Sequence, residues 1–153
     1  MPNDIIIYTD GAAKGNPGPG GYGTILMSGV HKKELSKGFA HTTNNRMELL
    51  AVIVGLEALK FDNCNITIYS DSKYVVDAVS KNWISTWLKT DFKNKKNKDL
   101  WLRYIKIAQK HNVTFVWVKG HNGNTYNERC DYLAVKASES SNLNEDSWYI
   151  QNN

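Results

Sequence analysis

Three strand-like segments open the chain with no helix between them, whereas the later strand-like segments are separated by helical patterns. The first is an apolar run at residues 5–9, which is typical of a strand buried on both faces. The next two, at 22–29 and 32–41, meet around Ser28-Gly29 and predict a hairpin. Strands joined by short turns pair antiparallel, and strands joined through helices pair parallel. The order therefore predicts an α/β protein with a five-stranded mixed sheet flanked by helices.

A long helical pattern at 42–61 is apolar around most of its circumference, so we expect a well-buried helix. Further strands are predicted at 65–70 and 113–120, and further helices at 72–80, 83–88, 99–111 and 127–137. The length of 153 residues fits one domain, which we assign to residues 1–140. Residues 141–153 form a polar acidic tail, expected to be loosely ordered unless Trp148 and Tyr149 dock it.

The formal net charge of +4 is unevenly distributed along the chain. Residues 138–153 carry only acidic charges, whereas residues 88–99 contain five lysines and two aspartates. A basic segment of this kind attracts polyanions such as nucleic acids, although a solvated loop is the alternative interpretation. Cys64 and Cys130 are far apart, no apolar run has membrane-spanning length, and no signal-peptide pattern opens the chain. We therefore expect a cytoplasmic protein with reduced thiols and no membrane partner.

The segment 15–23, GNPGPGGYG, contains the spacing G-x-G-x-x-G, which is half of a dinucleotide-binding fingerprint. A dinucleotide loop must lead into a helix, whose N-terminus receives the pyrophosphate. Here the loop leads into the strand-like segment 22–29, and its two prolines favour a turn. We therefore expect no organic cofactor, and interpret the segment as a turn that brings Asn16 and nearby backbone to a nucleic-acid groove.

Four acidic residues occupy informative positions. Asp10 and Asp71 each follow a predicted strand, and ligands bind beyond the carboxyl ends of strands in open α/β sheets. Glu48 lies in the first turn of the long helix, and Asp131 neighbours the apolar stripe of the last helix. Local alternatives exist: Asp10 as a turn residue, Asp71 as a helix cap, Glu48 in a capping box with Asn45, and Asp131 as an ordinary surface acid.

If the four carboxylates converge, they require a cation between them to remain ionised. An all-carboxylate set without clustered Cys or His favours Mg²⁺ or Mn²⁺. Two such ions would support phosphodiester hydrolysis. His121 lies in a glycine-containing loop after the last predicted strand, where it could move protons to and from the reacting groups.

Five motifs, in this order, carry a resemblance to bacterial ribonuclease HI that runs from Ile5 to about Ala137: YTDGAAKGNPGPGGYG, TTNNRMELLA, IYSDSKYV, DLW and WVKGHNGNTYNERCDYLA. The resemblance implies an RNase H-like fold and cleavage of the RNA strand of RNA–DNA hybrids, giving 5′-phosphate and 3′-hydroxyl ends. It implies two Mg²⁺ ions, replaceable by Mn²⁺, on Asp10, Glu48, Asp71 and Asp131. It identifies His121 as a mobile catalytic histidine.

The resemblance and the chemistry of the residues also point to a hybrid-binding surface. Reading the 2′-hydroxyl distinguishes RNA from DNA without favouring a base sequence, and lysines and indoles can follow the other strand. Lys73 stands where the family often has Gln. The expected contacts are Gly11, Asn16, Thr43, Asn44, Asn45, Lys73, Trp83, Trp87, Lys89, Lys95 and Lys96. For the two tryptophans, packing under the basic loop is an alternative that does not exclude contact.

Three other functions compete with the nuclease. They are a hybrid-binding module without catalysis, a cofactor enzyme that uses the glycine loop, and a DNA-cutting recombinase of similar fold. The presence of all four acids and His121 disfavours the first. We expect a monomer, because nothing in the sequence marks an interface.

Overall fold

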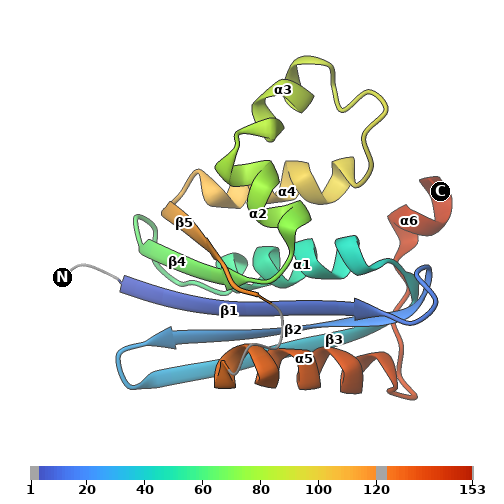
Figure 1. The fold of residues 1–153 in the computed structure, drawn as a ribbon, viewed down its shortest axis with the longest axis horizontal. Helices are drawn as coiled ribbons and strands as arrows, with labels where there is room; N and C mark the ends of the chain where they lie inside the picture. The colour runs from blue at the N-terminus through green and yellow to red at the C-terminus, as the bar shows by residue number, and fades with distance from the viewer. Residues whose placement is uncertain (1–3, 120–123, 153) are drawn as a thin grey trace.

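A computed structural model describes residues 4–119 and 124–152 and contains one mixed five-stranded sheet (Figure 1). The strand order is β3-β2-β1-β4-β5. Strands β1, β2 and β3 pair antiparallel, whereas β4 pairs parallel with both β1 and β5. The predicted α/β class and mixed sheet are therefore confirmed. The strands are β1 Asp4–Ala13, β2 Gly18–Ser28, β3 His31–Thr42, β4 Asn65–Ser70 and β5 Asn112–Trp117.

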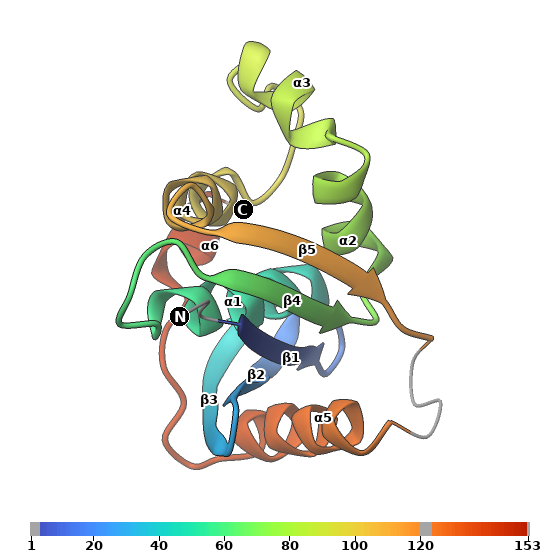
Figure 2. The same ribbon diagram turned by 90° about the vertical axis from the view of Figure 1, so that its left-hand side faces the viewer.

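Helices cover the two faces of the sheet unequally. Helix α1 packs on β1 and β2 beneath α4, and α5 covers β1, β2 and β3 from the opposite face (Figures 1 and 2). Helices α2 and α3 lead from the end of β4 towards the basic loop. No helix in the described parts of the chain is long and apolar enough to cross a membrane. The helices are α1 Asn44–Glu57, α2 Lys73–Ser80, α3 Trp83–Lys89, α4 Lys98–Ala108, α5 Thr125–Ser138 and α6 Ser147–Asn152.

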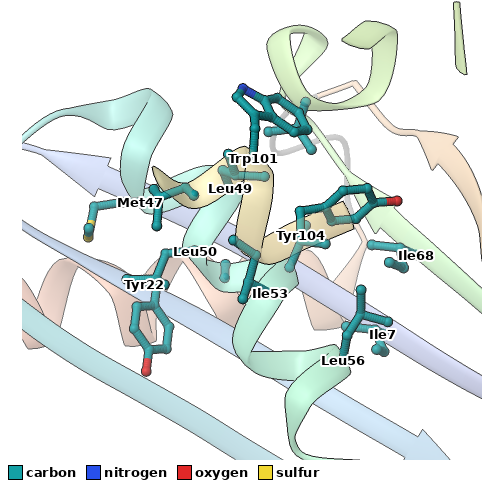
Figure 3. Packing of buried hydrophobic residues seen from close by; sticks show 14 of the residues in the cluster. Ile7, Tyr22, Met47, Leu49, Leu50, Ile53, Leu56, Ile68, Trp101 and Tyr104 are labelled. Carbon is teal, nitrogen blue, oxygen red and sulfur yellow. The ribbon is translucent and has the colours of Figure 1, made fainter. Parts of the chain in front are cut away.

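The main core lies between the sheet and α1, as the apolar circumference of that helix predicts. Ile7 of β1 lies beside Leu56 of α1, with Ile68 of β4 close by, and Trp101 and Tyr104 of α4 belong to the same cluster (Figure 3). All five of these side chains are buried. Burial of one such side chain contributes about 1.5–3 kcal/mol, so the position of α1 on the sheet is strongly fixed.

The glycine-rich segment is more regular than expected. The turn occupies only residues 14–17, because β1 continues to Ala13 and β2 begins at Gly18. Asp10 pairs with Gly23 and Ala13 with Gly20 in the β1–β2 ladder. The expectation of a loop up to residue 21 is therefore wrong: backbone pairing with β1 outweighs the low strand propensity of glycine. The G-x-G-x-x-G spacing falls within a strand and opens no helix.

The acidic tail packs against the body of the protein, although its polar composition suggests a loose segment. Asn144 exchanges backbone hydrogen bonds with β3, donating to Gly38 at 2.9 Å and accepting from Ala40 at 2.8 Å. Farther along, Tyr149 of α6 is buried. The sequence-based alternative, docking through an aromatic residue of the tail, agrees with this placement.

Candidate active site

Two of the four predicted acids meet at the sheet because neighbouring parallel strands bring them to the same level. The last paired residues of β1 and β4 are Tyr8 and Tyr69. Asp10 and Asp71 each lie two residues beyond this pair. Asp71 follows β4 as predicted, whereas β1 continues to Ala13, so Asp10 lies within its strand, just past the point where the pairing with β4 stops. The two carboxylates therefore lie side by side at the carboxyl end of the parallel pair.

Glu48 reaches the same place because α1 lies directly against β1. It lies just past the first turn of α1, which begins at Asn44, and not in the first turn as predicted. A β-carbon on Gly11 would clash with the backbone of Met47 and Glu48. Glycine is therefore required for this approach of helix to strand. Gly11, which we expected among the substrate contacts, thus has a second role in positioning Glu48 beside Asp10.

The local alternatives for two acids do not hold. Helix α2 is capped by Ser72, whose hydroxyl accepts a hydrogen bond from the third helical residue, so Asp71 is not the cap. Helix α1 is capped by Thr43, so Glu48 forms no capping box with Asn45. Both carboxylates are therefore free of the helix-end roles that the sequence alone allowed.

Asp131 approaches from the opposite face of the sheet, on α5. A β-carbon on Gly23 would clash with the carbonyl oxygen of Cys130, so α5 lies close to β2 at the residue that pairs with Asp10. The Cys130 thiol also donates a hydrogen bond to the carbonyl oxygen of Tyr8 at 3.3 Å. The next residue, Asp131, is close enough to raise the pKa of Asp10.

The cluster is electrostatically strained in the absence of a counter-charge. Burial, followed by the charge of Asp71, raises the pKa of Asp10 to about 8, against the hydrogen bond from the Gly11 amide at 2.9 Å. Burial, followed by the charges of Asp10 and Asp71, also raises the pKa of Glu48 well above its ordinary value. These carboxylates cannot all be ionised at neutral pH unless a cation lies among them.

The donor set fits a hard divalent cation. Each of Asp10, Glu48 and Asp71 contributes one carboxylate oxygen to a group in which all three oxygens lie within 4.8 Å of one another. One oxygen of Glu48 and one of Asp71 are buried without a hydrogen-bond partner among the described residues. Such atoms are rare unless an ion or water binds them, and carboxylate oxygens are the ligands that Mg²⁺ and Mn²⁺ prefer.

Of the residues expected to complete the site, the structure describes the asparagines but not the histidine. His121 lies outside the described residues. Asn16 and Asn44 are hydrogen-bonded to each other beside β1. The backbone N–H of Asn44 donates to Oδ1 of Asn16 at 2.9 Å, and the backbone N–H of Ala13 donates to Oδ1 of Asn44 at 2.6 Å. These bonds fix both side chains between the end of β1 and the start of α1.

A polar hollow of about 340 Å³ lies next to this pair. It is formed where the β1–β2 turn, the start of α1, the end of the basic loop and α6 meet. Its lining residues are Asn16, Pro17, Thr43, Asn45, Lys96, Asn97 and Tyr149. Three of the expected contacts and one of the expected lysines are therefore brought together around one space.

The basic segment stands on a cluster of aromatic rings. Trp87 packs against Trp83, Phe92 and Trp101, with ring centroids 6.4, 6.4 and 5.8 Å away. The Lys95 ammonium lies 5.4 Å from the centre of the Trp87 ring. The packing interpretation of Trp87 is thus correct, whereas Trp83 remains 41% exposed.

Lys89 and Lys96 are also exposed on this segment, and the remaining expected lysine lies elsewhere. Lys73, at the start of α2, places its ammonium 4.4 Å from the centre of the Trp117 ring. The indole nitrogen of Trp117 donates to the carbonyl oxygen of Asp71 at 3.2 Å. Lys73 is therefore held beside the carboxylate cluster and apart from the other lysines.

Three residues near the site were not predicted from the sequence: Arg46, Trp117, and Tyr149, which lines the polar hollow. Arg46 lies in the first turn of α1, where the helix dipole disfavours a positive charge. A positive charge at this unfavourable position indicates that the side chain has acidic partners. Arg46 is 2% exposed and forms ion pairs with Asp99 and Asp146. No comparable signal marks Tyr149, because its neighbours are distant in sequence.

Comparisons with known proteins agree with this arrangement. The family model described as RNase H matches residues 2–139. The chain is 52% identical over 153 residues to "Ribonuclease H" of Rippkaea orientalis, covering 97% of this chain and 93% of that protein. It is 56% identical over 145 residues to "Ribonuclease H" of Desulforamulus reducens, covering 92% of this chain and 91% of that protein.

Two solved structures show the same architecture. LC9-RNase H1, described as a type 1 RNase H with the type 2 active-site motif, has a TM-score of 0.81 and 27% identity, covering 99% of this chain and 81% of its own. LC11-RNase H1 in complex with an RNA/DNA hybrid has a TM-score of 0.68 and 26% identity, covering 88% of this chain and 96% of its own.

Proposed function

The chain belongs to the RNase H family and is a ribonuclease H; from that premise we propose that it hydrolyses the RNA strand of RNA–DNA hybrids by two-metal-ion catalysis. The observation that carries this proposal is the convergence of carboxylates from separate elements. Asp10, Glu48 and Asp71 come from β1, α1 and the end of β4, and Asp131 approaches from α5. A complex of LC11-RNase H1 with an RNA/DNA hybrid supports the choice of partner.

The four acids are proposed to hold two Mg²⁺ ions, for which Mn²⁺ can substitute. Bound there, the ions would lower the pKa of the attacking water and stabilise the charge on the leaving oxygen. Asp10 is central to the cluster, because both Asp71 and Asp131 act on its carboxylate. Cleavage at the 3′ oxygen would leave a 5′-phosphate and a 3′-hydroxyl end.

His121 is proposed to move a proton to or from the reacting groups. Its support is its sequence position, since it follows β5 and precedes the helix that carries Asp131. An imidazole changes charge near neutral pH and is suited to this task. Exchange of His121 for Ala is therefore expected to lower kcat more than it raises KM.

Recognition of the hybrid is proposed to combine groove and backbone contacts. Asn16 and Asn44 are fixed beside β1 with Asn45 close by, where amide groups can read the 2′-hydroxyl of RNA in the minor groove. Thr43 and Lys96 line the polar hollow, which suits a phosphate of the DNA strand. None of these contacts reads a base edge in the major groove, so cleavage is expected to be sequence-nonspecific.

The remaining contacts are proposed for the basic segment and for Lys73. Trp83 is exposed, and Lys89 and Lys95 are exposed on the same segment, where they can follow the DNA backbone. Trp87 supports this surface from below through its contacts with neighbouring rings. Lys73, next to Asp71, is in reach of a phosphate near the carboxylate cluster.

The deciding experiment compares four substrates of one sequence: RNA–DNA hybrid, duplex DNA, duplex RNA and single-stranded RNA. We expect release of RNA fragments from the hybrid with Mg²⁺, no release with chelator, and a loss of about a hundredfold or more in Asp10→Asn, because removal of a central metal ligand should cost at least as much as removal of a residue that only supports one. Undiminished cleavage by Asp10→Asn, or preferred cleavage of duplex DNA, would contradict the proposal. Mass spectrometry of the fragments tests the end chemistry.

A cytoplasmic location and a monomeric state complete the proposal. Cys64 and Cys130 are both buried free thiols, which is usual in a reducing compartment. Sedimentation equilibrium across a hundredfold range of concentration, roughly the span that exposes micromolar self-association, tests the monomer.

A further inference from the structure

The end of the chain lies beside the candidate substrate-binding surface. Helix α6 sits next to the β1–β2 turn and the start of α1, far in sequence from both (Figure 1). Tyr149 of α6 lines the polar hollow together with Thr43, Asn45 and Lys96. The hollow is therefore incomplete without the C-terminal segment.

The approach of this segment is fixed by a buried ion pair. Asp146 accepts hydrogen bonds from the Thr42 hydroxyl at 2.7 Å and from Nε of Arg46 at 2.7 Å. The second nitrogen of the Arg46 guanidinium donates to Asp146 at 2.9 Å. Thr42 and Arg46 flank Thr43, so the tail is tied to the residues on either side of a proposed phosphate contact.

Aromatic contacts hold the Tyr149 ring itself. The ring lies 5.7 Å from the His41 ring, and the Arg46 guanidinium lies 5.8 Å from its centroid. Only 9% of the residue is exposed, and it lines the hollow. A tyrosine held in this way is pre-organised: little conformational freedom would be lost when a ligand enters.

The chemistry of the hollow suits the sugar–phosphate backbone of a nucleic acid. Lys96 supplies a positive charge, Asn45 an amide and Thr43 a hydroxyl. A phenol adds an apolar face for a sugar and a hydroxyl that can donate to a phosphate oxygen. The hollow also lies near the carboxylates, because Thr43 caps the helix that carries Glu48.

Resting on the ribonuclease function proposed above, we propose that Tyr149 is a further substrate-contacting residue, which binds the DNA-strand backbone in the hollow, and that Asp146 and Arg46 position it. The C-terminal segment is then part of the hybrid-binding surface.

The first test separates substrate binding from folding and chemistry. In the full chain with Mg²⁺, Tyr149→Ala is expected to raise the KM for the hybrid about tenfold, and Tyr149→Phe about threefold, with kcat within a factor of two. Ile150→Ala, an exposed neighbour on α6, is the matched control and is expected to keep the parent KM. Tyr149→Phe retains the ring, so it reports on the hydroxyl even if the alanine variant fails to fold. Parent KM values in both Tyr149 variants would overturn the proposal.

The second test gives a readout that a purely structural role would not move. A single neutral methylphosphonate is placed at successive positions of the DNA strand. The parent enzyme is expected to show one position, displaced from the cut, at which the substitution raises KM about tenfold. In Tyr149→Phe this penalty should shrink to about threefold, because the two changes remove parts of one contact. An unchanged penalty would overturn the proposal.

The two proposals fail in different ways. If the parent enzyme does not cut the hybrid, the ribonuclease function itself is wrong. If the parent cuts the hybrid but the Tyr149 variants match it in KM and in the methylphosphonate scan, only the role of Tyr149 is wrong.

Discussion

The backbone of Glu48 lies directly against Gly11, so that the N-terminal part of α1 touches β1 with no side chain between them. A β-carbon on Gly11 would meet the Glu48 amide nitrogen and would lie 2.8 Å from the β-carbon of Met47. The distance between the Asp10 and Glu48 carboxylates thus depends on the absence of a side chain at Gly11. The helix is also held by the core, so it cannot retreat from β1 without disturbing buried contacts.

Gly11→Ala is therefore expected to push the N-terminal part of α1 away from β1. Misplacement of Glu48 by about 1 Å should lower kcat by roughly a hundredfold, and overpacking should lower the free energy of unfolding by about 1–3 kcal/mol. Steady-state kinetics and urea unfolding measure the two effects. Gly29→Asn is the matched control, because Gly29 has φ +60° and open space around it, and Asn tolerates this conformation. Parent-like kcat in Gly11→Ala would contradict the packing argument.

Metal-free protein is expected to lose stability as pH rises. Asp10 has a pKa of about 8 in the folded protein and an ordinary value of 3.8, so the folded state binds more protons between these values. Stability from this group is fully present below about pH 4 and is lost as pH rises through 8. Mg²⁺ should therefore raise Tm more at pH 8 than at pH 5.5, because it binds the ionised cluster.

Thermal unfolding in chelator and in Mg²⁺ across this pH range measures the effect, and Asp10→Asn isolates the group. In chelator at pH 8 this variant should be more stable than the parent, by roughly 1–3 kcal/mol, since one pKa unit corresponds to about 1.4 kcal/mol and other carboxylates remain. A variant less stable than the parent under these conditions would show that the cluster carries no such strain.

The sequence predicts the parts of the site that depend on local pattern. Asp10 and Asp71 each follow an apolar run in the sequence, and parallel neighbours place such residues together, so the pair could be predicted although β1 continues past Asp10 to Ala13. The start of β2 at Gly18 could not, because glycine has low strand propensity and Gly18 pairs with Thr42, at the far end of β3. The helix-end alternatives for Glu48 and Asp71 also required the structure, because Thr43 and Ser72 are equally good caps in the sequence.

The tail was the least predictable part, because its docking depends on a partner about a hundred residues away. Nothing near Asp146 in the sequence indicates that Arg46 will meet it, nor that Asp99 will complete the group. A polar acidic composition favours disorder unless such a charge is buried nearby. Composition alone therefore predicted a loose segment, because it could not show the buried arginine that Asp146 binds.

Arg46 is expected to be the most sensitive charged residue for stability. Its guanidinium is almost fully buried and donates to Asp99 at 2.8 and 2.9 Å as well as to Asp146. Arg46→Ala leaves two carboxylates without their partner, which should cost about 3–5 kcal/mol. Lys14→Ala is the control: the pair between Lys14 and Glu139 is 2.6 Å long but half exposed, and such pairs contribute at most about 1 kcal/mol. Urea unfolding compares them, and equal effects would contradict the role of burial.

Trp83 and Trp87 of α3, the helix that leads into the basic segment, are expected to respond differently to substitution. Trp87 touches three other aromatic rings, so Trp87→Ala should destabilise the protein by about 2–4 kcal/mol and also raise KM by displacing the lysines above it. Trp83 is 41% exposed, so Trp83→Ala should change stability by less than about 1 kcal/mol. It should still raise KM about fivefold if the indole contacts the DNA strand.

The same segment is expected to set the salt dependence of binding. Each lysine that neutralises a phosphate steepens the fall of affinity with salt, by about 0.9 in the slope of log K against log salt concentration. Lys89→Ala combined with Lys95→Ala should therefore reduce the slope for hybrid binding by nearly 2, whereas Trp83→Ala should leave it unchanged because an indole carries no charge. Binding of the cleavage-deficient Asp10→Asn protein to hybrid between 50 and 300 mM salt, roughly the range in which such slopes are resolved, measures this. An unchanged slope in the double lysine variant would place the DNA strand elsewhere on the protein.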